Sequence, residues 1–150
     1  MEPYDSEKAA RVWQRVRPNG GESLTGDGLN ALISQLLHLS TVYQALSRQV
    51  KPPQSTALKA LSDQKRTQAA CLRGIHILLI GPCPALRVPQ LRSEPLSTAL
   101  HRCYAEETQL WTQLRIHSAA STHAPALEAL ATMQQAHCRS IAELIGQLER

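Results

Sequence analysis

The sequence predicts an all-α protein built mainly from four long helices. Apolar residues make up 43% of the 150-residue chain, whereas aromatic residues make up 3% and phenylalanine is absent. A core built from Leu, Ile, Val and Ala favours packed helices over sheets. Apolar positions also recur at alternating intervals of three and four residues in four stretches, which is the pattern of a helix face turned toward other helices. Prolines, glycines and small polar residues separate these stretches.

The first 26 residues form a separate unit in this interpretation. Residues 6–16 predict a short amphipathic helix, which Pro18, Asn19, Gly20 and Gly21 end, and a polar loop runs on to Gly26. The apolar face of this helix holds Ala9, Val12, Trp13 and Val16. We therefore divide the chain into an N-terminal accessory helix with its loop (1–26) and a helix bundle (27–150), over which we expect the short helix to fold.

The first two long helices are predicted at 27–50 and 55–80. The first has an almost wholly apolar inward stripe, which we call its seam, and Lys51-Pro52-Pro53 then breaks the helix. Ser55 is a plausible N-cap for the second helix. Because the connection is short, we expect these two helices to be antiparallel neighbours.

A long connection is predicted to follow at 81–92, where three prolines make the segment irregular. Twelve extended residues reach about 37 Å, close to the length of a 25-residue helix, so this segment suits a crossover along the whole bundle. The second and third long helices would then be parallel. We expect the third helix to begin near Ser93 as its N-cap, a linker at 118–122, and a fourth helix with its seam at 127–148 and Pro125 in its first turn.

Three of the four seams are interrupted near their middle by polar side chains. These are Lys65, Gln68, Glu107, Gln134 and His137. Residues three apart on a helix project from one face at similar depth, so the two pairs and Glu107 should meet in the interior. Burying them is costly unless each finds a partner. We expect Tyr43 and Tyr104 to pack beside this layer with their hydroxyls bonded to it.

At this point the chain resembles the ferritin-like superfamily, and more narrowly rubrerythrin-type proteins, over residues 28–148. The resemblance depends on four segments. They are the stretch from Leu32-Ile33 to Tyr43, residues 68–75 (QAACLRGI), residues 103–107 (CYAEE) and Ala136-His137-Cys138. It implies a ferritin-like four-helix bundle with a long crossover between the second and third helices.

The resemblance also implies a di-iron site whose ligands are mostly replaced. Family members with a working site carry a Glu on the first and third helices and Glu-x-x-His on the second and fourth. Here these positions match Leu36, the pair Lys65 and Gln68, Glu107, and the pair Gln134 and His137. Only Glu107 and His137 survive. We therefore expect no metal cofactor and no catalytic residues, with Lys65 replacing the cations and pairing with Glu107.

An alternative remains open in the sequence. A site rebuilt around Glu107 and His137, with His38 or a cysteine added, would make the protein an iron- or manganese-binding oxidoreductase. The chain has four cysteines, namely Cys71, Cys83, Cys103 and Cys138, with no C-x-x-C pair. Buried, reduced thiols are the simpler interpretation for three of them, whereas Cys83 lies between prolines and is expected to be more exposed.

Charge and hydropathy limit which other functions the sequence predicts. The net charge is +4, but the basic residues are scattered without aromatic residues between them, so we expect no nucleic-acid binding. No apolar run reaches the roughly 18 residues of a membrane span, and the first residues do not resemble a signal peptide. We therefore expect a cytoplasmic protein. A homodimer with an unidentified ligand or protein partner is the assembly that we expect of such a bundle.

Overall fold

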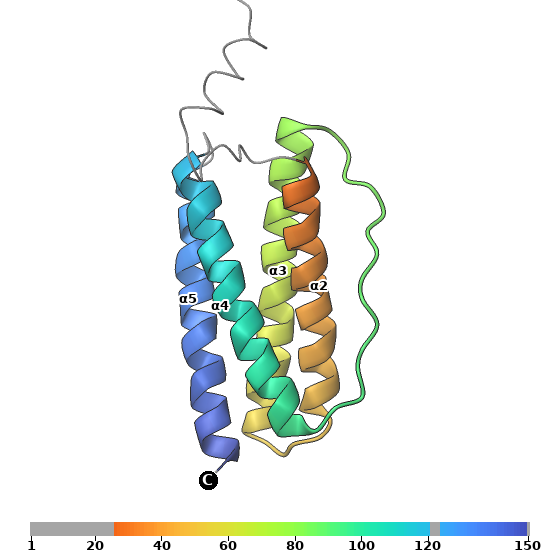
Figure 1. The fold of residues 1–150 in the computed structure, drawn as a ribbon, viewed down its shortest axis with the longest axis vertical. Coiled ribbons are helices and arrows are strands. Elements are labelled where there is room, and N and C mark those ends of the chain that lie inside the picture. The colour runs from red at the N-terminus through yellow and green to blue at the C-terminus, as the bar shows by residue number, and fades with distance from the viewer. Residues whose placement is uncertain (1–25, 121–123, 150) are drawn as a thin grey trace, which may run out of the picture.

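The computed structural model describes residues 26–120 and 124–149, and these residues form four α-helices and no strand. In chain order the helices are α2 (Gly26–Ser47), α3 (Gln54–Leu79), α4 (Leu96–Ala120) and α5 (Ala124–Leu148) (Figure 1). The prediction of an all-α chain with four long helices is confirmed. The accessory helix predicted at 6–16 lies outside the described residues. No helix in the described ranges combines the length and the apolar character that crossing a bilayer requires.

The helices form two antiparallel hairpins joined by a long crossover. Helices α2 and α3 make the first hairpin and α4 and α5 the second, and backbone approaches are concentrated within each hairpin. After Leu79 the chain runs down the outside of α2 to the opposite end of the molecule, where α4 begins (Figure 1). Helices α3 and α4 therefore run in the same direction. The backbones of the two hairpins come close at few points, so side chains must fill the space between them.

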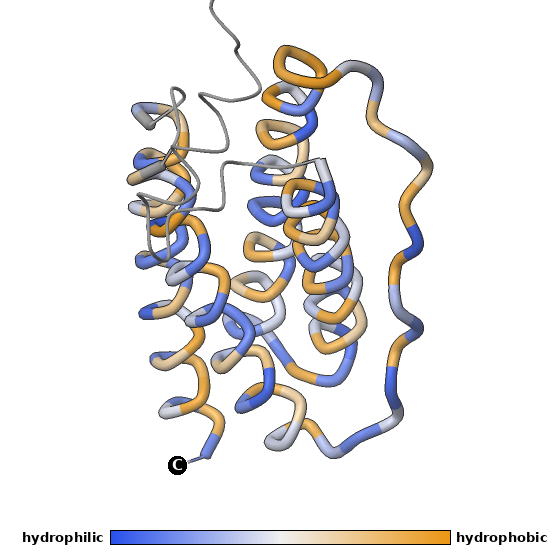
Figure 2. Tube along the Cα trace, turned by 45° about the horizontal axis from the view of Figure 1, so that its top comes forward, coloured by the Kyte–Doolittle hydropathy of each residue, from blue (hydrophilic) through white to orange (hydrophobic). Residues whose placement is uncertain are grey.

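The predicted seams form the core. Figure 2 shows that hydrophobic and hydrophilic positions alternate along every helix. Leu36 on α2, Leu72 on α3, Leu114 on α4 and Ile141 on α5 are each at most 1% exposed. The seam positions are thus buried along most of each helix, as the alternation of three and four residues predicts. Leu79 at the end of α3 is an exception, since it is 42% exposed.

Four predicted boundaries are wrong by a few residues. Helix α2 ends at Ser47 rather than at residue 50. Ser55 is not the N-cap of α3, because the helix begins at Gln54 and Pro53 occupies the cap position without a side-chain hydrogen bond. Ser93 does not cap α4, which begins at Leu96, so the irregular connection is longer than its prolines suggested. Residues 118–120 belong to α4 rather than to a linker. Sequence signals for helix ends are the least exact because fraying and local packing shift them.

The end of α3 is capped by backbone hydrogen bonds. The amides of Ile80 and Gly81 donate to the carbonyl of His76 at 2.9 and 3.1 Å, and the His76 ring Nδ1 lies 2.8 Å from the Gly81 carbonyl. Gly81 has φ +129°, a conformation that side-chain-bearing residues rarely adopt. The glycine therefore permits the sharp exit of the chain from α3 into the crossover.

The core assignment is tested by a pair of substitutions on α4. Leu114 is 1% exposed and Ile116 is 39% exposed. Leu114→Ala should lower the free energy of unfolding by about 2–5 kcal/mol, since it leaves a cavity between the hairpins. Ile116→Ala should change it by less than about 1 kcal/mol. Denaturant unfolding measures both values, and equal effects of the two substitutions would contradict the orientation of α4.

Candidate functional site

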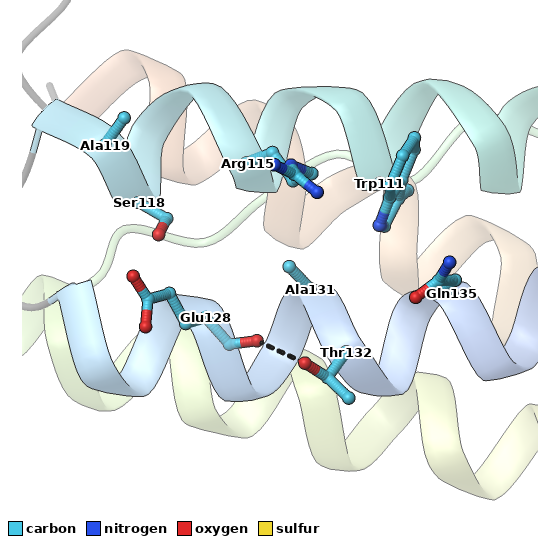
Figure 3. A pocket seen from close by; sticks show the side chains of 8 residues that line it. All are labelled: Trp111, Arg115, Ser118, Ala119, Glu128, Ala131, Thr132 and Gln135. Carbon is cyan, nitrogen blue, oxygen red and sulfur yellow. Dashed lines mark hydrogen bonds between the residues drawn. The ribbon is translucent and has the colours of Figure 1, made fainter.

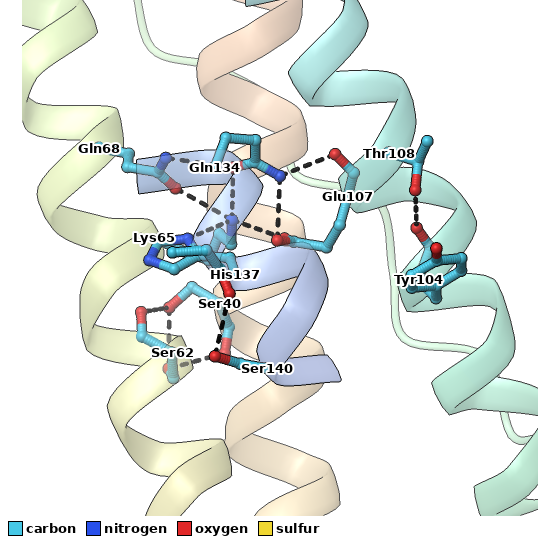
Figure 4. Close-up of polar contacts among 11 residues, drawn as sticks. Ser40, Ser62, Lys65, Gln68, Tyr104, Glu107, Thr108, Gln134, His137 and Ser140 are labelled. Carbon is cyan, nitrogen blue, oxygen red and sulfur yellow. Dashed lines mark hydrogen bonds and ion pairs between the residues drawn. The ribbon is translucent and has the colours of Figure 1, made fainter. Parts of the chain in front are cut away.

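The five polar seam residues meet in the interior of the bundle, as the sequence predicted. They come from three helices, Lys65 and Gln68 from α3, Glu107 from α4, and Gln134 and His137 from α5 (Figure 4). Their exposed fractions lie between 0% and 5%. We call these five residues the polar cluster. It links the two hairpins at mid-length of the helices, and the backbones of these hairpins come close at few points.

Lys65 is the centre of the polar cluster. Its Nζ lies 2.6 Å from Glu107 Oε1, and this ion pair is fully buried on both sides. Three other acceptors surround the same nitrogen: Gln134 Oε1 at 2.7 Å, Gln68 Oε1 at 3.0 Å and His137 Nδ1 at 3.0 Å. An ammonium group offers three donors and no acceptor, so a shell made only of acceptors fits the charged form of lysine. The positive charge at the centre of the polar cluster is therefore the Lys65 side chain itself.

Gln134 bridges the cation and the anion of the cluster. Its Oε1 accepts from Lys65 and, at 3.1 Å, from Gln68 Nε2. Its Nε2 donates to Glu107 Oε2 at 3.0 Å and to the Glu107 backbone carbonyl at 2.8 Å. The opposite amide orientation would turn an NH₂ group toward the ammonium and an oxygen toward the carboxylate. Only the observed orientation complements both charges.

Burial and electrostatic attraction shift the pKa values of the ion pair in opposite directions. Burial lowers the pKa of Lys65 and raises the pKa of Glu107, because both charged forms lose hydration. The attraction between the two groups and the hydrogen bonds around them oppose these shifts in each case. The pair is therefore stable as long as both partners and their amide neighbours are present, and each partner depends on the other.

His137 is neutral in this arrangement. Burial is the main cause that lowers its pKa to about 4, and the Lys65 ammonium adds to the effect. Since Nδ1 faces the ammonium, it must accept a hydrogen bond, which leaves the ring proton on Nε2. A second proton on the ring would turn a donor toward Lys65. His137 therefore completes the shell of Lys65 only as the neutral imidazole.

Tyr43 lies beside the polar cluster, but Tyr104 does not. The Tyr43 side chain is fully buried, and burial followed by the charge of Glu107 raises its pKa well above the usual value. Its hydroxyl is close to Glu107 without forming a hydrogen bond of regular geometry. Tyr104 is 42% exposed, so the prediction that its hydroxyl bonds to the layer is wrong. It precedes Glu107 by three residues but lies on the edge of the buried face of α4.

The sequence reasoning missed a serine pair next to the cluster. Ser40 Oγ and Ser62 Oγ lie 3.0 Å apart, and each hydroxyl reaches the other residue's backbone carbonyl, at 2.9 and 2.8 Å (Figure 4). Ser62 is one turn before Lys65 on α3. Small hydroxyl residues let α2 and α3 approach closely here while satisfying one another. The available signal was the three-residue spacing of Ser62 and Lys65 on one helix face.

The residues proposed for a rebuilt metal site do not join Glu107 and His137. His38 faces the crossover, with its Nδ1 3.2 Å from the Pro89 carbonyl. Cys71 is exposed and Cys138 is half-buried, which corrects their assignment as buried thiols. Cys83 is half-buried near Asn30, so the expectation that it is more exposed than the other cysteines is wrong. Cys103 is buried, and burial is the main cause that raises the pKa of its thiol to about 12. Among the described residues, no group of three or more His, Cys, Asp or Glu side chains is arranged to hold a metal ion.

A surface groove lies apart from the cluster between α4 and α5. Its volume is about 380 Å³. Arg115 lies over the ring of Trp111 there, 5.3 Å from its centre, and Glu128 faces the groove from α5 (Figure 3). None of the five cluster residues lines it. The lining of the groove contains no histidine or cysteine, so the polar cluster is the stronger candidate site.

The fold and the site define an all-helical protein whose two hairpins meet at a buried, ionised polar cluster. Comparisons with models of protein families, with curated proteins and with solved structures find no match to this chain. The function must therefore be argued from the cluster itself.

Substituting Lys65 tests the ion pair. Lys65→Met leaves the Glu107 carboxylate buried without a counter-charge, so the free energy of unfolding should fall by about 3–5 kcal/mol. Adding Glu107→Leu should recover much of that loss, since an apolar pair of similar volume is often as stable as a buried ion pair. Lys59, which is exposed on the same helix, gives the control Lys59→Met. Denaturant unfolding at neutral pH measures all three, and a silent Lys65→Met would show that the pair is not formed.

The neutral His137 predicts a pH-dependent stability. With a folded pKa of about 4, below the ordinary 6.5, its contribution is complete above pH 6.5 and is lost as the pH falls toward 4. That loss should be on the order of 2 kcal/mol, given about 1.4 kcal/mol per pKa unit and the partial solvent screening of the ring. His137→Gln should flatten the pH dependence in this window, because the amide does not titrate.

The control for this prediction is Ile116→Gln on α4, since Ile116 is 39% exposed and carries no titratable group. It should leave the slope between pH 4 and 6.5 nearly unchanged. Unfolding experiments across this range measure both variants, and NMR titration of the His137 ring gives its pKa directly. A His137 pKa near 6.5 in the folded protein would refute the buried, neutral assignment.

Proposed function

We propose that this chain is a ferritin-like bundle related to rubrerythrin-type proteins that has lost most of its di-iron ligands and serves as a non-catalytic binding or structural module, acting as a homodimer. The observation that carries the proposal is the position of Lys65 Nζ, surrounded by four acceptors at 2.6–3.0 Å in the middle of the bundle. In this interpretation the ammonium replaces the positive charge of the lost metal ions.

The donor set does not fit a di-iron centre. Two divalent ions carry four positive charges, whereas the cluster offers one carboxylate, Glu107, and one imidazole, His137. A protonated lysine has no lone pair to give to a metal. The atoms Glu107 Oε1 and His137 Nδ1 are both directed at Lys65 Nζ, at 2.6 and 3.0 Å. A metal ion at this place would have to displace the ammonium from both candidate ligands.

The positions of the cluster support descent from such a site. In an ancestral arrangement, carboxylates and histidines from several helices would converge at mid-length, with three-residue spacing on two of them. Lys65 and Gln68 on α3 and Gln134 and His137 on α5 keep this spacing, and Glu107 keeps its carboxylate. The resemblance matches Leu36 on α2 to the Glu of the first helix, and Leu36 is 1% exposed in the core. Burying polar side chains in the core costs stability. Their presence there favours descent from a metal site whose ligands were later replaced.

The proposal predicts little metal in the purified protein. Expression in medium rich in iron and manganese, followed by elemental analysis, should give far less than one metal ion per chain. The oxidoreductase alternative predicts near-stoichiometric metal with an absorption spectrum to match. Metal bound in a stoichiometric amount, and lost in Glu107→Gln or His137→Gln, would overturn the non-catalytic assignment.

A restored ligand set tests the descent directly. The variant carrying Leu36→Glu, Lys65→Glu, Gln68→His and Gln134→Glu should bind Co²⁺, with thermal stabilisation by the metal and the visible spectrum of bound cobalt. The matched control keeps Lys65 and carries the other three changes, and it should bind cobalt far more weakly because the ammonium remains. A folded four-fold variant that binds no better than this control would contradict the correspondence of positions.

A further inference from the structure

An exposed apolar turn lies at the end of α3. Four consecutive large hydrophobic residues are exposed there, Ile77 by 58%, Leu78 by 77%, Leu79 by 42% and Ile80 by 53%. Consecutive positions on a helix point in different directions, so several sides of this turn are apolar. Figure 1 shows that the turn extends beyond the first turn of α2, and Figure 2 shows its hydrophobic colour. We call residues 77–80 the α3 cap.

The α3 cap lies where the chain enters the bundle. Gly26, the first residue of α2, is next to it, since a Cβ atom at Gly26 would lie 3.2 Å from Ile80 Cδ1. The described part of the chain therefore begins beside the α3 cap, and residues 1–25 are covalently joined to it there. Any apolar segment in this part of the chain is held close to the exposed turn by its covalent connection.

The sequence supplies such a segment at 6–16. The apolar positions Ala9, Val12, Trp13 and Val16 have the spacing of one helix face, and Lys8, Arg11 and Arg15 lie on other faces. The nine residues 17–25 reach up to about 30 Å when extended, whereas one helical turn is about 5.4 Å long. A tether of this length gives an effective concentration on the order of millimolar, above the concentration of a second copy in dilute solution.

We propose that the α3 cap is the docking site of the chain's own N-terminal segment 6–16, with Trp13 packed against Leu78 and Ile80. A contiguous exposed apolar surface is a liability unless it is covered, and the tethered amphipathic segment covers it without a second chain. This inference is independent of the polar cluster and of its proposed origin.

Trp13 fluorescence in the full-length chain tests the docking. The sequence contains two tryptophans, so Trp111→Phe leaves Trp13 as the single reporter. Trp13 should emit at shorter wavelength than in denaturant and be poorly quenched by iodide. Leu78→Ser combined with Ile80→Ser should raise the quenching constant several-fold and shift the emission to longer wavelength. The matched control is Met133→Ser on α5, where a hydrophobic side chain 38% exposed lies away from the α3 cap.

Two further measurements keep the outcome unambiguous. Amide hydrogen exchange in the otherwise unaltered chain should show protection within 6–16 that the double serine variant loses, which avoids any effect of changing Trp111. Sedimentation then distinguishes the occupants of the α3 cap. Trp13 equally quenched in native buffer and in denaturant, or unaffected by the serine substitutions, would overturn the proposal. So would Trp13 protection that grows with protein concentration together with a dimer that the serine substitutions dissociate.

Discussion

The buried pair of Lys65 and Glu107 is the interaction on which the interior of this bundle depends. Its 2.6 Å contact joins the α2–α3 hairpin to the α4–α5 hairpin, whose backbones approach each other at few points. Both side chains have lost their hydration, so neither charge is tolerable without the other. The surrounding amides and the imidazole have one arrangement that satisfies both charges, and this arrangement fixes how α3, α4 and α5 are placed along one another.

A cluster of this kind is a source of specificity more than of stability. An apolar core of equal volume would hold the hairpins about as tightly, but leucine side chains tolerate shifts along a helix that directional hydrogen bonds do not. Gln134 illustrates the constraint, because it contacts Lys65, Gln68 and Glu107 at once. The serine pair Ser40 and Ser62 adds a second directional link, within the first hairpin. Together these contacts give the helices a single alignment in a core that is otherwise almost entirely aliphatic.

The sequence was sufficient for the seams and the polar cluster, and insufficient for the helix ends, for partly exposed side chains and for the buried serine pair. The alternation of three and four residues identified the buried seams, and the polar interruptions at Lys65 and Glu107 predicted their meeting, because helical periodicity and the cost of burying charge leave few alternatives. Helix ends and partly exposed side chains depend on a few weak local contacts. For that reason Ser55 and Ser93 were wrongly assigned as caps, and Tyr104 was wrongly placed against the cluster. Ser40 and Ser62 were missed, since serine is common on both buried and exposed faces.

The central claim is that the Lys65 side chain is charged and buried away from water. Nitrogen-15 NMR of the lysine ammonium groups tests this claim most directly. The chain has four lysines, at positions 8, 51, 59 and 65. A buried ammonium that donates hydrogen bonds to Gln68, Gln134 and His137 and is paired with Glu107 should exchange its protons slowly with water at neutral pH. We predict one slowly exchanging ammonium signal with proton contacts to these side chains. Fast exchange at all four lysines, or a neutral amine signal for Lys65, would contradict the claim.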